Sequence, residues 1–287
     1  MKILTLNTHS LQEEHYEQKL DWFVEGILRE MPDLIALQEV NQTAEAEVID
    51  PAMLKGQYPV PGCMKIRRDN HAAQVAYRLH QAGVEVSWAW IPIKLGYGKY
   101  DEGVAILSLG RNIQCVDSFP VSKVDDYYNW RTRAVLGVKL AGLDDWFYTV
   151  HLGWWDDESE PFLEQWIKLN CCIISKQLCS PVWLLGDFNA SDLIRGESYD
   201  TIRSSGWMDT YGAAEQKDDG ITVPGVIDGW REKLAGTEAK GMRLDYIWCN
   251  QAKKIRSSRV IFNGSNCPVV SDHFGVLIET KEQCKYE

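Results

Sequence analysis

The chain has 287 residues, of which 45% are apolar and 25% charged, and this composition excludes a disordered protein. Its length suits one large α/β domain, so we expect a single domain over residues 1–287. The formal net charge of −11 makes the averaged surface repel polyanions, which argues against nonspecific binding to nucleic acid or to an anionic membrane.

The cysteines and the N-terminal segment both point to the cytoplasm. The eight cysteines form no Cys-x-x-Cys pair, which favours reduced thiols over a disulfide framework or a zinc site. The N-terminal segment is polar by Asn7 and lacks the apolar centre of a signal peptide. Apolar runs in the sequence stay well short of the roughly 20 residues that cross a bilayer. We therefore expect a cytoplasmic protein with no membrane partner.

The first forty residues predict a strand, a helix and a second strand. The first strand covers residues 3–8, and a capping box of Ser10 and Glu13 opens the helix. Apolar residues then recur at helical spacing until Pro32 ends the helix. Residues 33–39 form a nearly continuous apolar run that ends in Glu39, which is typical of a buried strand with a polar tip.

Strands dominate the rest of the chain. They are expected over residues 103–109, 134–140, 146–152, 182–185, 243–249, 260–262 and 274–279. An amphipathic helix opened by Pro161 and reaching Leu178 precedes the strand at 182–185. The Gly- and Asp-rich segment 212–241 is long for a loop in a compact domain, and such loops tend to be functional or disordered. Its Trp230 favours an ordered loop that faces a substrate.

Polar side chains follow several of these apolar strands at the point where each strand ends. They are Asn7, Glu39, His151, Asp187 with Asn189, and Asp272 with His273, and a further carboxylate, Asp245, lies inside a strand. Burying these groups is costly unless they pair with one another or with a cation. Each one alone is more often a turn or cap residue than a ligand. Together they predict a shared site.

The order of these motifs resembles the endonuclease/exonuclease/phosphatase superfamily of magnesium-dependent phosphoesterases. The matching motifs are Asn7, Gln38-Glu39, His151, Gly186-Asp187-Phe188-Asn189, Leu244-Asp245-Tyr246 and Ser271-Asp272-His273. The resemblance covers nearly the whole chain. It implies an α/β fold, a four-layered α/β/β/α sandwich of two mixed sheets with outer helices, whose active-site loops gather at one end.

The resemblance also implies roles for these residues in phosphoester hydrolysis. Glu39, with Asn7 and Asp272, would hold Mg²⁺, which prefers hard oxygen ligands, and Mn²⁺ is a possible substitute. Asp187 would orient and deprotonate the attacking water. Asn189 would hold that water or a phosphoryl oxygen. These roles require no covalent intermediate.

A second set of residues would contact the phosphate. In the family pattern Asp245 pairs with His273, which then donates a hydrogen bond to the phosphoryl group. His151 would be a second phosphate contact. A phosphate-facing base often precedes the strand at 134–140 in related enzymes, and both Arg133 and Arg131 fit that place. The other histidines, His9 among them, are expected to be surface or packing residues.

Residues outside these motifs must decide the substrate. Trp154, Trp155 and Trp230 are predicted to line a pocket, because flat aromatic faces suit the C–H face of a sugar ring. The segments at 101–106 and 227–230 resemble the maltose 6'-phosphate phosphatase branch, which implies a small sugar phosphate as substrate. The alternatives are a DNA endonuclease or exonuclease, disfavoured by the acidic balance, and a sphingomyelinase-like phosphodiesterase, disfavoured by the lack of a membrane-docking hairpin.

Overall fold

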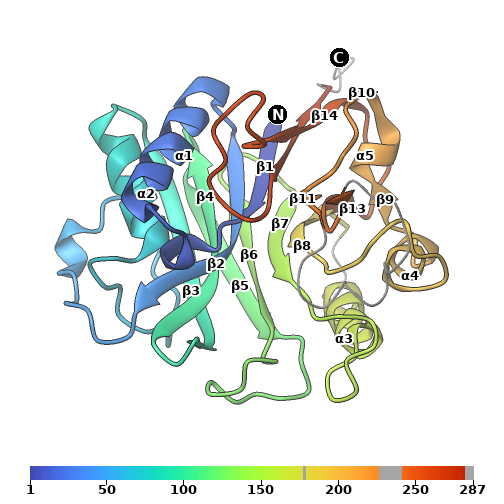
Figure 1. Cartoon of the computed structure of the whole chain (residues 1–287), viewed down its shortest axis with the longest axis horizontal. Helices are drawn as coiled ribbons and strands as arrows, with labels where there is room; N and C mark the ends of the chain where they lie inside the picture. The colour runs from blue at the N-terminus through green and yellow to red at the C-terminus, as the bar shows by residue number, and fades with distance from the viewer. Residues whose placement is uncertain (177–178, 226–240, 282–287) are drawn as a thin grey trace.

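The computed structural model describes residues 1–176, 179–225 and 241–281 (Figure 1). Two β-sheets pack face to face and helices cover their outer faces. The covering helices are α1 (Tyr16–Glu30) and α2 (His71–Gln81) on one side, and α3 (Phe162–Ser175) and α4 (Ser198–Ser204) on the other. The predicted α/β sandwich of two mixed sheets with outer helices is confirmed.

One sheet carries the first two strands of the chain near its centre. Within the described residues its strands are, in spatial order, β10 (Ala214–Lys217), β14 (Ile255–Ile261), β15 (Gly275–Thr280), β1 (Lys2–Asn7), β2 (Leu34–Thr43), β4 (Tyr100–Leu109) and β3 (Val86–Gly96). β1 runs parallel to β2, whereas β1 and β15 are antiparallel, so the sheet is mixed.

The second sheet is formed by the middle of the chain. Over the described ranges its strands are, in spatial order, β5 (Ile113–Pro120), β6 (Ala134–Leu140), β7 (Trp146–His151), β8 (Val182–Asp187), β13 (Asp245–Cys249) and β9 (Met208–Asp209). β7 runs parallel to β8, and β13 is antiparallel to β8. The short elements outside the two sheets are η1 (Ser10–Gln12), η2 (Pro51–Met53), α5 (Thr210–Ala213), β11 (Val223–Pro224) and β12 (Gly241–Met242).

Apolar contacts fill the spaces between the four layers. Along β1, Ile3 faces the second sheet whereas Leu4 faces α1 and α2, because neighbouring side chains of a strand point to opposite faces. In β8 the same alternation places Leu185 between the sheets and Leu184 against α3. Burial on both faces explains why these strands appear in the sequence as almost continuous apolar runs.

The first helix begins later than the sequence predicted. Ser10 lies in η1, and its hydroxyl donates to the backbone carbonyl of Glu39 at 2.7 Å, while α1 begins after His15. The predicted capping box of Ser10 and Glu13 is therefore wrong. The Ser10 hydroxyl bonds to the bulge of β2 instead, which ties the loop after β1 to the strand that carries Glu39.

Several elements were not predicted from the sequence. They include α2, β3, β5 and α4, the short η2, β9 and α5, and the short β10 and β11 within the segment 212–241 that was expected to be a loop. β5 lies at the edge of its sheet and exposes several polar side chains, so it lacks the apolar run of a central strand. Leu178 and residues 226–240 lie outside the described residues. Among the described helices, none combines the length and apolar character needed to cross a membrane.

Candidate active site

The polar strand ends gather at one end of the sandwich, around a cleft of about 690 Å³. Because β1 and β2 are parallel, and β7 and β8 are parallel, the carboxyl ends of each pair meet at one edge of their sheet. Of the described residues, those that line the cleft are His9, Glu39, Lys94, Gly96, Tyr97, Glu102, Trp130, Arg133, His151, Trp154, Asp187, Asn189, Asp272 and His273. Most of the residues predicted to share a site therefore do share one.

Strand register brings the groups of the second sheet together. Asp187 at the end of β8 is paired with His151 on β7 and with Asp245 on β13. The Asp187 Oδ2 atom lies 3.5 Å from His151 Nε2 and 3.9 Å from His273 Nε2. The neighbouring strands β7 and β13 and the loop before β15 thus place their polar groups next to the Asp187 carboxylate.

Asn7 connects this group to the first sheet. Its side-chain Nδ2 donates to Glu39 Oε1 at 2.8 Å and to Asp187 Oδ2 at 3.2 Å. Behind it, the buried Gln38 amide donates to the Thr149 hydroxyl at 2.8 Å, which joins β2 to β7 across the sandwich. These buried amides fix how the two halves of the site face each other.

The backbone at the site is bent where it must aim side chains into the cleft. Glu39 and Asn189 have positive φ values of 51° and 46°. Glu39 sits in a bulge, because the pairing of β2 with β4 shifts register between Leu37 and Val40. Residues in this sparsely populated conformation cluster at functional sites.

Asp187 is a buried carboxylate in a mixed electrostatic environment. Burial, helped by the Asp245 charge and opposed by the His273 charge, raises its pKa to about 7. The Asn189 backbone N–H donates to Asp187 Oδ1 at 2.9 Å. A carboxylate whose pKa lies near neutrality can exchange a proton with water in either direction.

His273 and His151 differ in charge although both are buried. His273 Nδ1 donates to Asp245 Oδ2 at 2.9 Å. Burial would lower the pKa of His273, but the carboxylates of Asp245 and Asp187 outweigh it and raise that pKa well above its usual value. Burial and the nearby cations Arg133 and Lys94 lower the pKa of His151 well below its usual value. The site therefore pairs an imidazolium with a neutral imidazole.

The carboxylates of Glu39 and Asp272 suit a divalent cation, whereas the Asn7 amide turns its Nδ2 toward Glu39 and its Oδ1 accepts from the His9 backbone N–H at 3.2 Å. Burial raises the pKa of Glu39, and the negative charges of Glu102 and Asp272 raise it further. An ion placed among these carboxylates would offset that cost, and carboxylate and amide oxygens are the donors that hard cations prefer. A second group of potential ligands, Asp187, Asp245 and His273, has its ligand atoms within 4.8 Å of one another. These residues fit a bound divalent metal.

The structure separates the two candidate phosphate-binding arginines. Arg133 lines the cleft and is almost fully buried, and its buried Nε has no hydrogen-bond partner. Arg131 instead donates to Asp157 at 2.8 Å, and its guanidinium lies 4.2 Å from the centre of the Trp130 ring. Of the two arginines that the sequence left open, Arg133 is the one that lines the cleft, and its contact with phosphate stays a prediction.

The predicted tryptophans lie in different surroundings. Trp154 lines the cleft with Trp130, and their ring centres are 5.9 Å apart. Trp155 lies in the turn that follows and packs instead against Phe162 of α3, with ring centres 6.2 Å apart. The expectation that Trp155 lines the cleft is corrected accordingly. Trp230 lies outside the described residues.

An ion pair inside the cleft was missed in the sequence. Lys94 Nζ lies 3.0 Å from Glu102 Oε1, and both side chains are about nine-tenths buried. The two residues are neighbours in the register of β3 and β4. Each residue lies inside a strand rather than at its end, so neither residue spacing nor a turn signal in the sequence indicated that it belongs to the site.

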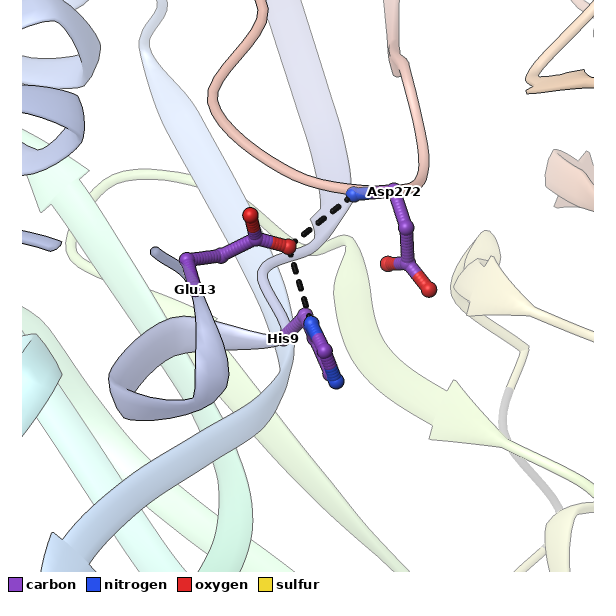
Figure 2. Close-up of side chains that lie close together, drawn as sticks. All are labelled: His9, Glu13 and Asp272. Atoms are coloured by element: carbon purple, nitrogen blue, oxygen red, sulfur yellow. Dashed lines mark hydrogen bonds and ion pairs between the residues drawn. The ribbon is translucent and has the colours of Figure 1, made fainter. Parts of the chain in front are cut away.

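His9 also lies in the cleft, although it was expected to be a surface or packing residue. Figure 2 shows that one oxygen of Glu13 accepts hydrogen bonds from His9 Nδ1, at 2.8 Å, and from the backbone N–H of Asp272, at 3.2 Å. The other oxygen of Glu13 accepts from Lys19. Glu13 therefore holds the His9 ring and the Asp272 loop at the rim of the cleft.

Comparisons with known proteins show the family. The model of the Endonuclease/Exonuclease/phosphatase family matches residues 4–273. An endonuclease/exonuclease/phosphatase family protein from Leptotrichia buccalis is 32% identical, with a TM-score of 0.84 over 98% of this chain and 100% of that one. Among curated protein sequences, none matches the chain closely enough to count as a relative.

More distant solved structures share the fold. A mannosyl-6-phosphatase from Bacteroides thetaiotaomicron is 16% identical, with a TM-score of 0.64 over 98% of this chain and 100% of that one. A 3' phosphatase from Neisseria, bound to a product DNA hairpin, is 19% identical, with a TM-score of 0.61 over the same shares. The chain belongs to the endonuclease/exonuclease/phosphatase family and is a metal-dependent phosphoester hydrolase.

Proposed function

We propose that the chain is a cytoplasmic, Mg²⁺-dependent phosphatase that removes phosphate from a small sugar phosphate such as maltose 6'-phosphate. The observation that carries this proposal is the aromatic pair Trp130 and Trp154 in the same cleft as Asp187 and His273. A phosphatase with a mannosyl phosphate substrate has the same fold, which is consistent with a sugar phosphate here.

The lining of the cleft suits a sugar next to a phosphate. Trp130 has 46% of its surface exposed and Tyr97 has 67%, so both present aromatic faces to solvent. The C–H face of a sugar ring packs on such faces, and carboxylates beside them accept hydrogen bonds from its hydroxyls. Glu102 and Asp272 line the same cleft. A small polar ligand would thus find both kinds of contact.

Asp187 is the proposed general base. Its carboxylate would accept a proton from the water that attacks phosphorus in line with the leaving oxygen, and a pKa near 7 suits that transfer. The Asn189 amide lies beside it, with its Nδ2 donating to the Leu152 carbonyl at 2.9 Å. That bond leaves the amide oxygen of Asn189 to orient the water.

The remaining polar groups would bind the phosphoryl oxygens. His273 would donate from Nε2, since Asp245 holds Nδ1, and Arg133 and His151 would contribute further contacts. Asn7, Glu39 and Asp272 are proposed to hold Mg²⁺, with Mn²⁺ as a possible substitute. When bound, the ion supplies positive charge that stabilises the charge developing on the phosphoryl group.

DNA is the alternative substrate, because a relative in fold is a DNA 3' phosphatase. The net charge of −11 disfavours a polyanionic partner. Since the catalytic groups serve either substrate, the choice depends on the walls of the cleft. Nucleic acid is therefore not proposed as a partner.

A phosphate-release screen tests this proposal. Purified protein is assayed with Mg²⁺ on maltose 6'-phosphate, other sugar phosphates, nucleotides and a 3'-phosphorylated DNA hairpin, and then with EDTA. We expect the highest kcat/KM on a sugar phosphate, loss of activity in EDTA, and a loss of at least about 100-fold in Asp187→Asn. Equal or better turnover of DNA would overturn the sugar-phosphate assignment, and full activity in EDTA would overturn the metal requirement.

A further inference from the structure

Two buried cations stand side by side in the wall of the cleft, and the catalytic roles above use only one of them. Lys94 on β3 and Arg133 before β6 have 8% and 4% of their surfaces exposed. Both line the cleft that contains Asp187 and His273. Lysine and arginine are rarely buried to this extent without a dedicated partner.

The two cations converge on one backbone atom. Lys94 Nζ donates to the carbonyl oxygen of Trp130 at 3.1 Å, and an Arg133 terminal nitrogen donates to the same oxygen at 2.8 Å. Since both nitrogens bond to a single atom, they lie within about 6 Å of each other. Two like charges at this separation repel each other, and negative charge next to both is needed to offset that repulsion.

The negative charges of Glu102, Glu39, Asp187 and Asp157 all act on Arg133, but the hydrogen bonds of its guanidinium go to backbone carbonyls. Glu102 forms its ion pair with Lys94, while the other hydrogen bond of Arg133 goes to the carbonyl of Thr132. Arg133 Nε is buried without a partner, so one guanidinium edge has an unfilled donor. Buried donors without partners are rare in folded proteins and point to a missing acceptor. What Arg133 lacks is therefore an acceptor for this donor, which an oxygen of a bound phosphate would supply.

We propose that Lys94 is a further substrate-binding residue, and that with Arg133 it forms a twin-cation site that selects dianionic phosphomonoesters over singly charged phosphodiesters. This inference rests on the proposed function, because it assigns the same cleft a terminal phosphate. A monoester carries close to two negative charges at neutral pH, since its second pKa is about 6, whereas a diester carries one. Lys94 has three N–H donors, and its two contacts leave one for the ligand.

The experiment compares two esters with the same leaving group. Wild-type protein and Lys94→Met are assayed with Mg²⁺ on p-nitrophenyl phosphate, a monoester, and on bis(p-nitrophenyl) phosphate, a diester. Because Lys94→Met leaves Glu102 buried without its partner, the double variant Lys94→Met/Glu102→Gln is measured beside it. Lys99→Met, in the turn between β3 and β4, is the matched control, since its ammonium lies over the Tyr100 ring on the surface.

We expect the monoester-to-diester ratio of kcat/KM to fall at least about tenfold in both Lys94 variants, which corresponds to about 1.4 kcal/mol of selectivity. Lys94→Arg should recover part of the ratio, because it restores a cation, and Lys99→Met should keep the wild-type ratio. A ratio that stays the same in the Lys94 variants while their thermal unfolding matches wild type would overturn the inference.

Inorganic phosphate separates this inference from the proposed function. Its Kd, measured by calorimetry, is expected to rise at least about tenfold in Lys94→Met, with a smaller change for dimethyl phosphate. If wild type cleaves DNA and no sugar phosphate but phosphate binding still depends on Lys94, the proposed function fails and the twin-cation site stands. If wild type is a sugar phosphatase and neither readout changes in Lys94→Met, the site fails and the function stands.

Discussion

The side-chain amide of Asn7 on the first sheet donates a hydrogen bond to the carboxylate of Asp187 on the second sheet, at 3.2 Å. The same nitrogen donates to Glu39 at 2.8 Å. One amide therefore couples the proposed metal ligand to the proposed general base. Glu39 lies on the neighbouring strand of the same sheet, whereas the contact with Asp187 exists only because the two sheets pack with this alignment.

Replacing Asn7 should weaken metal binding and catalysis together. Asn7→Ala removes the amide that donates to Glu39 and that is itself proposed as a ligand, and loss of a group that orients a ligand typically costs 10- to 100-fold in metal affinity. We expect the half-activating Mg²⁺ concentration to rise by about that factor. Gln12→Ala, on the neighbouring η1 turn, is the control. An unchanged Mg²⁺ dependence in Asn7→Ala would contradict the assigned ligand.

Asp245 should set the charge of His273. Asp245 and Asp187 raise the pKa of His273 well above its usual value against the effect of burial. Activity that needs the imidazolium is present below this raised pKa and is lost as pH rises through it. Asp245→Asn should therefore move the alkaline limb of the kcat/KM profile to lower pH, which a pH series on wild type and variant measures. A limb that stays in place would show that His273 is not the group responsible.

Ionisation of Asp187 should lower the stability of the folded state. Burial raises its pKa to about 7, whereas the unfolded value is 3.8, so the folded state binds the proton more tightly. The penalty is absent below the unfolded value, grows as pH rises, and is complete above about pH 7. In EDTA, Asp187→Asn should thus unfold at a higher temperature than wild type at pH 8, with a difference that shrinks toward pH 4. A difference independent of pH would refute this account.

The core of the site was predictable because its residues follow apolar strands directly. Asp187 ends β8, and the sequence signals this strand end through the abrupt change from apolar to polar. Glu39 follows an apolar run in the same way, although β2 continues past it to Thr43 after a bulge. Lys94 and Glu102 were not predictable, because they lie within strands and meet only through the register of β3 with β4. Register depends on which strands pair, and the local pattern does not contain that information.

Trp154 and Trp155 likewise show that the local sequence does not determine which side chain faces the cleft. Trp154 and Trp155 are equivalent in the sequence, yet one lines the cleft and the other packs on α3. The helix α2 could have been found, because Asn70 caps it by accepting from the Ala73 N–H at 3.0 Å and its apolar residues recur at helical spacing. The sequence therefore contained a local signal for α2, whereas it contained none for the different orientations of the two tryptophans.

Arg131 should act through Trp130 rather than on phosphate. It donates to Asp157 at 2.8 Å and stacks on the Trp130 ring at 4.2 Å. Arg131→Met removes this support, so we expect KM for a sugar phosphate to rise about 3- to 10-fold with little change in kcat, in line with the energy of one aromatic contact. KM for p-nitrophenyl phosphate, which has no sugar, should change less. An equal rise for both substrates would point to a phosphate contact instead.

Gly186 should be required for the fold at the end of β8. Its φ is 146°, and a Cβ added there would lie 1.9 Å from the Val150 carbonyl oxygen, far inside contact distance. That oxygen belongs to β7, whose pairing with β8 holds His151 next to Asp187, so neither strand can shift without opening the site. Gly186→Ala should lower the free energy of unfolding by about 3 kcal/mol or more, as severe backbone conflicts do.

The control for Gly186→Ala is Gly196→Ala. Gly196 has a φ of 81°, with open space where the Cβ would be placed, so its substitution carries only the cost of a positive φ, about 1–2 kcal/mol. Urea denaturation of both variants measures the difference. If the two variants lost the same stability, the close approach of β7 to Gly186 would not be what excludes a side chain, and the alignment of His151 with Asp187 would tolerate movement of the strands.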